Sequence, residues 1–202
     1  MRPRKYSDAG QVFPIYITVV AGLLFLAFAY LAVGQAAATR NGAQTAADAA
    51  ALAAAQDRRD QLAGRWLDNL LDPGLWQDIF DGDVDGLDPS CWRAQQLADQ
   101  NDAHVVPGGC TPEWFPMGYT VEVKTNDPVG ETIVPGTEQK YATAKATAVI
   151  EPRCSFLLPD EDNGNNVDLP QLNCRNKNWD LDPDDPSGLP GPKDLFDVHL
   201  AD

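Results

Sequence analysis

An uninterrupted apolar stretch near the N-terminus is the clearest pattern in the chain. No charged residue occurs between Asp8 and Arg40, and residues 12–34 are almost wholly apolar. As a helix this stretch rises about 35 Å, enough to cross a bilayer core of about 30 Å. Tyr16 and Tyr30 stand near its two ends, where aromatic rings favour the membrane interface. The pattern predicts a transmembrane helix.

An alanine-rich run continues this helix through residues 36–71. Alanine has the highest helix propensity, the run contains no proline, and Leu62, Trp66 and Leu70 recur at helical spacing. Residues 72–74, Asp-Pro-Gly, end it. Alanine faces allow another backbone to approach closely. The run therefore packs tightly against neighbouring helices or its own sheet, or it is a solvated helix with ordinary core contacts.

The charges at the N-terminus predict the orientation of the span. Arg2, Arg4 and Lys5 precede it, and basic residues favour the cytoplasmic side, so the rest of the chain is expected outside the cell. A cleaved secretory signal is the alternative, with residues 36–38, three alanines, as the cleavage region. The apolar core of a signal is about 7–15 residues long, so the greater length here favours an uncleaved anchor.

Two later stretches alternate apolar and polar residues, as half-buried strands do. Residues 118–125 place Tyr119, Val121 and Val123 on one face, and residues 140–151 place alanines and Ile150 on one face. Residues 132–134 form a shorter strand candidate. We expect an α+β fold in which a small antiparallel sheet packs on the outer part of the long helix.

Short helices and an acidic tail complete the expected domain. Residues 74–80 suit one helix, and Asp88 and Pro89 suit the cap and first turn of another. Residues 159–202 hold 11 acidic and 3 basic residues. A segment of this composition buries too little apolar surface to fold alone. It is expected to be irregular and extended, with residues 194–200 docked or free.

The overall charge excludes one class of partner. After the first 13 residues, which carry a net charge of +2, the chain has 12 basic and 29 acidic residues, a net charge of −17. Such a surface repels phosphate backbones, so nucleic-acid binding is excluded.

An acidic turn has the spacing of a partial calcium loop. Asp81, Asp83 and Asp85 are followed by Gly86, and alternate carboxylates converge on calcium in such loops. The twelfth position is Trp92, where the full loop needs a bidentate glutamate. A structural calcium site and a solvated acidic turn are the two interpretations, and no other cofactor is expected.

The cysteines Cys91, Cys110, Cys154 and Cys174 all follow the apolar span. An even number in an exported domain favours two disulfides, for which three pairings exist. The short loops that they close favour Cys91–Cys110 and Cys154–Cys174. No Cys-x-x-Cys pair occurs, which disfavours zinc, and free thiols are the remaining alternative.

No catalytic constellation emerges from the sequence. Only His104 and His199 are present, which leaves few ways to build a nucleophile and base pair. We expect a protein that is not an enzyme and has no small-molecule substrate.

Residues 8–10, the apolar span and residues 40–55 together resemble the N-terminal segment of TadE/TadG-like proteins of Tad (Flp) pilus assembly systems. The most specific part is the phrase Gln-x-Ala-Ala-Asp-Ala-Ala-Ala-Leu-Ala-Ala-Ala at residues 44–55. The remainder is similar to the outer domains of actinobacterial members. The resemblance implies a pilin-like, membrane-anchored component that contacts other pilus subunits through its N-terminal helix.

The resemblance also implies a processing question. Pilin-like members are cut after a glycine that precedes the apolar stretch. Gly10 occupies this position here, so a cut would leave Gln11 as the new N-terminus. The aromatic residue at the sixth position is present as Tyr16, but Ile15 stands where those members carry glutamate. TadG-like members keep their anchor uncut.

These inferences converge on a single-pass protein of the cell membrane, with a cytoplasmic N-terminus and an extracellular domain, in a pilus for adhesion or secretion. The alternative is an exported acidic surface-binding protein, with or without calcium, that has no filament role. The expected divisions are a leader at 1–11, the span at 12–34, its soluble continuation at 35–72, a disulfide-stapled domain at 73–158 and the tail at 159–202.

Overall fold

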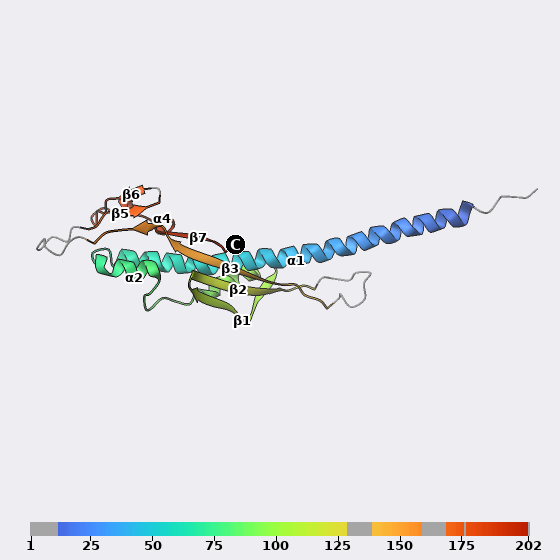
Figure 1. Ribbon diagram of the computed structural model, residues 1–202. Coiled ribbons are helices and arrows are strands. Elements are labelled where there is room, and N and C mark those ends of the chain that lie inside the picture. Colours follow the sequence, from blue (N-terminus) through green and yellow to red (C-terminus); the bar gives the residue numbers. More distant parts are fainter. Residues whose placement is uncertain (1–11, 129–138, 159–168, 176, 202) are drawn as a thin grey trace, which may run out of the picture.

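One long helix organises the whole molecule (Figure 1). The computed structural model describes residues 12–128, 139–158, 169–175 and 177–201. Helix α1, Val12–Asp68, is continuous over 57 residues, which confirms that the apolar span and the alanine-rich run form one helix. Its N-terminal half projects away from the other elements, which gather along its C-terminal half (Figure 1).

Short helices follow the end of α1. The 3-10 helix η1 (Pro73–Leu75) leads into α2 (Trp76–Asp81), which ends at Gly82 in the left-handed conformation, with φ of 77°. The third helix, α3, spans Cys91–Asp99. Its N-cap is Ser90 rather than the expected Asp88, so Pro89 precedes the helix instead of occupying its first turn. Asp88 is instead attached to α1, because its N–H donates to Gln61.

The main sheet is antiparallel, with strand order β1-β2-β3-β7. Its strands are β1 (Ala103–Trp114), β2 (Met117–Thr125), β3 (Thr143–Pro152) and β7 (Phe196–Leu200). A second sheet contains β4 (Cys154–Ser155), β5 (Leu172–Cys174) and β6 (Lys177–Trp179). The helices η2 (Pro186–Gly188) and α4 (Pro192–Leu195) precede β7. The α+β fold is confirmed.

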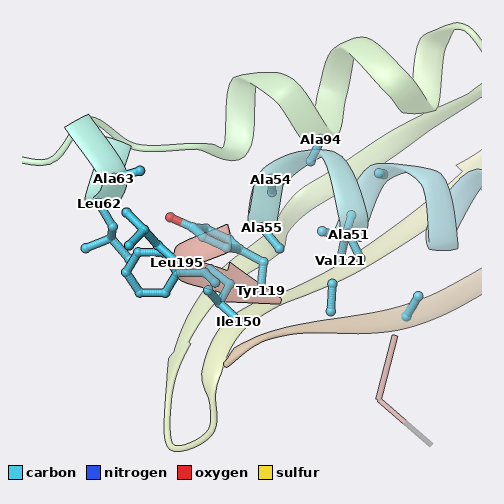
Figure 2. Packing of buried hydrophobic residues seen from close by; sticks show 14 of the residues in the cluster. Ala51, Ala54, Ala55, Leu62, Ala63, Ala94, Tyr119, Val121, Ile150 and Leu195 are labelled. Carbon is cyan, nitrogen blue, oxygen red and sulfur yellow. The ribbon is translucent and has the colours of Figure 1, made fainter. Parts of the chain in front are cut away.

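The core lies where the second half of α1 is enclosed by β2, β3 and α3. Figure 2 shows Ala51, Ala54 and Ala55 of α1 between Ala94 of α3 and the sheet residue Val121. The alanines at 46, 47, 50, 51, 54 and 55 are fully buried, as are those at 94, 98 and 148. The predicted contact between an alanine-faced helix and an alanine-faced strand is therefore confirmed.

An aromatic cluster closes the core near the end of α1. The ring of Trp76 lies 5.3 Å from that of Trp66 and 5.2 Å from that of Phe156. Phe80 lies 5.5 Å from Phe196 at the start of β7. Tilted and edge contacts at these distances stabilise beyond the area that they bury, so the cluster joins α1, α2 and the C-terminal segment.

Two parts of the chain differ from the expectations. Strand β1 was not expected, because residues 107–109, Pro-Gly-Gly, suggest a loop; the strand accommodates them through a register shift between Val105 and Cys110. The tail is not wholly irregular either. Leu195 and Phe196 are buried, and β7 pairs with β3. The strand candidate at 132–134 lies outside the described residues.

Candidate functional site

The free half of α1 is the first candidate site. Its large side chains are exposed all along it, among them Phe13, Leu23, Phe25, Leu26 and Phe28. Monomeric soluble proteins rarely expose so large an apolar surface unless it binds something. By length and composition, α1 is the one described helix that qualifies as a membrane span, so it is a candidate membrane anchor.

The polar groups of this half are compatible with a lipid environment. Within residues 12–34, the hydroxyl of Thr18 donates to the Pro14 carbonyl at 2.8 Å; just beyond them, that of Thr39 donates to the Gln35 carbonyl at 3.1 Å. Within a bilayer, polar groups must find partners inside the protein. Thr18 thus satisfies its hydroxyl within the helix, and Tyr16 and Tyr30 are exposed near the two ends of the span.

A short exposed section joins the apolar half to the domain. Residues 35–42 are exposed or half-exposed, and the first fully buried side chain of α1 is Ala43. From there, small side chains replace the bulky ones of the span. The same helix thus has a wide apolar surface of bulky side chains in its first half. In its second half it has a narrow surface of small side chains, which the sheet and α3 enclose.

Polar contacts hold the loop after α2 against α1. The Gln61 side chain accepts from the Asp88 N–H at 2.7 Å and donates to the Asp88 carbonyl at 3.2 Å. The Arg65 guanidinium donates to the carbonyls of Asp85 and Gly86 at 3.1 and 2.9 Å. Arg58 donates to the Tyr119 hydroxyl at 3.0 Å and so links α1 to β2.

The predicted calcium ligands follow the same loop. Asp81 ends α2, and Asp83 and Asp85 come after it. Arg65 already places a fixed positive charge against the carbonyl of Asp85. Within the described ranges, no three carboxylate, imidazole or thiol side chains are grouped as a metal ion requires. The calcium site stays a prediction.

Both disulfides join distant elements of the domain. Cys91 of α3 is bonded to Cys110 of β1, and Cys154 of β4 to Cys174 of β5. This is the pairing that the short loops favour. The first bond attaches α3 to the edge of the main sheet, and the second attaches the C-terminal segment to the end of β3. The processing residues Gly10 and Gln11 lie outside the described part of the chain.

The two histidines do not form a catalytic pair. His104 lies in β1 with its Nδ1 atom 2.8 Å from the Asn126 side chain, and His199 lies in β7. The Leu200 carbonyl accepts a hydrogen bond from His199 and, with the charges of Glu151 and Asp197, raises the pKa of this imidazole. Arg175 bridges the same two carboxylates, so these groups form an exposed charge cluster on the sheet.

Together these features define an α+β domain mounted on a helix whose free half is a candidate membrane anchor. Residues 10–57 match the model of a family described as putative Flp pilus-assembly, TadE/G-like. The chain is therefore TadE/G-like in its N-terminal segment, which confirms the resemblance. The match covers about a quarter of the chain and includes both the apolar half of α1 and its buried alanines between residues 43 and 55. No curated protein and no solved structure matches the chain.

Proposed function

We propose that this protein is a membrane-anchored structural or assembly component of a Tad/Flp-type pilus, used for surface adhesion or secretion. Residues 12–34 cross the membrane with the N-terminus in the cytoplasm, and the α+β domain lies outside the cell. One observation carries the proposal: the helix that the TadE/G-like family model matches is exposed and apolar over one half and enclosed by the domain over the other.

The role is mechanical. In the membrane, the bulky apolar side chains of α1 contact lipid or the helices of other pilus subunits. Such helices associate by close van der Waals packing, because lipid offers no hydrophobic driving force for it. The enclosed half of α1 holds the domain at a defined distance from the membrane surface. The protein is not an enzyme in this proposal, and the matched family is described as one of pilus assembly.

Membrane insertion tests the anchor directly. The double substitution Leu23→Asp and Leu26→Asp places two carboxylates in the span, at about 2.5–3.5 kcal/mol each. We expect the variant to leave the membrane fraction after a carbonate wash. The matched control is Leu67→Asp with Leu71→Asp, because both of these leucines are also exposed, but Leu67 lies in the last turn of α1 and Leu71 just after it. Equal retention of both variants would refute the anchor.

Orientation and processing need separate measurements. Protease added to intact cells is expected to remove an epitope in the domain and to spare one attached to the N-terminus; the reverse result refutes the orientation. Mass spectrometry of the mature N-terminus distinguishes an intact start from a new start at Gln11. Cleavage near residue 38 would instead show a secretory signal.

The pilus role is tested by crosslinking in cells. A photoreactive residue at Phe25, which is exposed, is expected to capture other pilus subunits, and the same residue at Leu67 is expected not to. Failure of Phe25 to capture any pilus component would favour the alternative, an exported acidic binding protein. Calorimetric titration with calcium tests the metal-dependent form of that alternative, since absence of both heat and a thermal shift removes it.

A further inference from the structure

A groove lies between α2 and the β1–β2 hairpin. It has a volume of about 660 Å³, and its apolar lining includes Phe80, Met117 and Ile150. The Met117 sulfur packs against Gly82, so closely that a Cβ atom at this position would collide with it. Phe80 and Ile150, which form the floor of the groove, belong to the buried core, so packing holds them in place. The groove is therefore built into the fold.

Two aromatic side chains stand at the edge of this groove without covering it. Trp114 is 68% exposed and Phe115 is 99% exposed, and both line the groove. They occupy the end of β1 and the turn that follows it. Large aromatic side chains are the residues that most often dominate binding energy at interfaces. Their exposure here serves no packing role within the described chain.

The rim of the groove is acidic. Asp78, Asp81 and Asp83 line it from the α2 side, and all three are exposed. Among the described residues, no lysine or arginine forms an ion pair with any of them. A fourth rim carboxylate, Glu151, is paired with Arg175. The rim thus presents three uncompensated negative charges beside an apolar floor.

The location of the groove suits contact with another protein. Helix α2 lies beside the C-terminal end of α1, at the end of the molecule opposite the free apolar half (Figure 1). The chain itself is a poor occupant, because residues 159–168 carry four acidic residues and no basic one, and the whole chain has a net charge of −15. Like charges across an interface oppose association.

We propose that this groove binds a segment of a partner protein that presents apolar side chains flanked by lysine or arginine. The apolar groups enter between Phe115 and Met117, and the basic groups meet the rim carboxylates of Asp78, Asp81 and Asp83. Apolar contact at the centre and complementary charge at the rim are the usual arrangement of a specific interface. The proposal goes beyond the pilus role, since it concerns only the domain.

The test uses the full chain in nanodiscs of zwitterionic lipid, which do not attract basic peptides. A displayed library of random 12-residue peptides is selected on the protein and counter-selected on empty nanodiscs. We expect the retained peptides to be enriched in lysine or arginine next to phenylalanine, leucine or tryptophan. The dissociation constant of one enriched peptide is then measured by fluorescence anisotropy.

Matched variants locate the site. Phe115→Ser is expected to weaken binding of that peptide about tenfold or more, as loss of a central aromatic does; Trp92→Ser, on α3, is the control. The triple variant Asp78→Asn, Asp81→Asn and Asp83→Asn is expected to weaken binding about tenfold and to reduce its salt dependence. The control for this triple variant is Asp99→Asn, Asp180→Asn and Asp184→Asn, which removes the same charge at positions away from the groove and is expected to leave binding unchanged.

Three results would overturn the proposal. One is a library without basic and apolar enrichment, and another is equal loss of binding in the groove and control variants. The third is concentration-dependent self-association that Phe115→Ser abolishes, because the occupant would then be a second copy of this chain. Near-ultraviolet circular dichroism of each variant shows that the domain is folded, so that loss of binding reports the groove itself.

Discussion

Enlarging one buried alanine tests whether close packing around α1 stabilises the domain. Ala54 is fully buried, and Figure 2 shows it on the part of α1 nearest Ala94 of α3. Leucine adds three carbon atoms there, and α3 cannot move away freely because the Cys91–Cys110 bond attaches it to β1. Excess volume in a well-packed core costs about 1–3 kcal/mol. For a domain of this size, that predicts a fall in melting temperature of about 2–12 °C in Ala54→Leu.

The matched control is Gln56→Leu, two residues further along the same helix, where the side chain is exposed. Leucine, glutamine and alanine differ little in helix propensity, so propensity alone predicts almost no difference between the two variants. Thermal unfolding of the full chain in detergent micelles, followed by far-ultraviolet circular dichroism, measures both. A decrease in Ala54→Leu no greater than that in Gln56→Leu would refute close packing as the stabilising contact.

Three further outcomes are expected. Replacing Cys91 and Cys110 together by alanine opens a loop with a sequence separation of 19, which lowers the free energy of unfolding by about 3 kcal/mol; a change in melting temperature below about 2 °C contradicts this. Phe196→Ala removes a buried ring at about 3–5 kcal/mol and should speed hydrogen exchange throughout β7; unchanged exchange would show that the strand docks without it. The raised pKa of His199 beside Glu151 contributes stability below the ordinary histidine pKa, and this contribution disappears as pH rises through the folded value. The melting temperature of the wild type should therefore be slightly higher than that of His199→Gln near pH 5.5, and the two should be equal by pH 8.5. A difference that grows with pH would contradict the raised pKa.

Patterns that depend on local spacing were predicted well from the sequence. The alternation at Tyr119, Val121 and Val123 identified the buried face of β2, and all three side chains are buried. The spacing of Leu62, Trp66 and Leu70 likewise identified buried residues: Leu62 and Trp66 lie in α1, and Leu70 lies in the turn just after it. In both cases each residue follows the period of its own element, so no knowledge of distant partners was needed.

Elements that depend on distant partners were not predicted as strands. Strand β7 belongs to an acidic tail, and its burial comes from pairing with β3 and from contact between Phe196 and Phe80. Residues 103–114 contain a Pro-Gly-Gly sequence that usually marks a loop. They form β1 because residues 103–105 and 110–114 pair with β2 on either side of the irregularity. The groove beside α2 combines residues from three separate segments, 78–83, 114–117 and 150–152, so no sequence window contains it.

The change of side-chain size along α1 gives the two halves of one helix different surfaces. Bulky residues such as Phe25 and Phe28 give the free half a wide surface that matches lipid or neighbouring helices. Alanine in the enclosed half lets a sheet and α3 approach opposite sides of the backbone without a large gap.

The continuity of α1 also connects its free half to the far end of the domain without a break. Sharp kinks need a proline, a glycine and serine pair, a π-bulge or an inserted group. In α1 the single proline is Pro14, in the first turn, where it removes no helical hydrogen bond. Residues 35–42, about 12 Å of helix, lie between the predicted span and the part of α1 that the domain encloses. A shift or rotation of the free half is therefore expected to move the groove beside α2 with it, which a flexible linker at the same place would prevent.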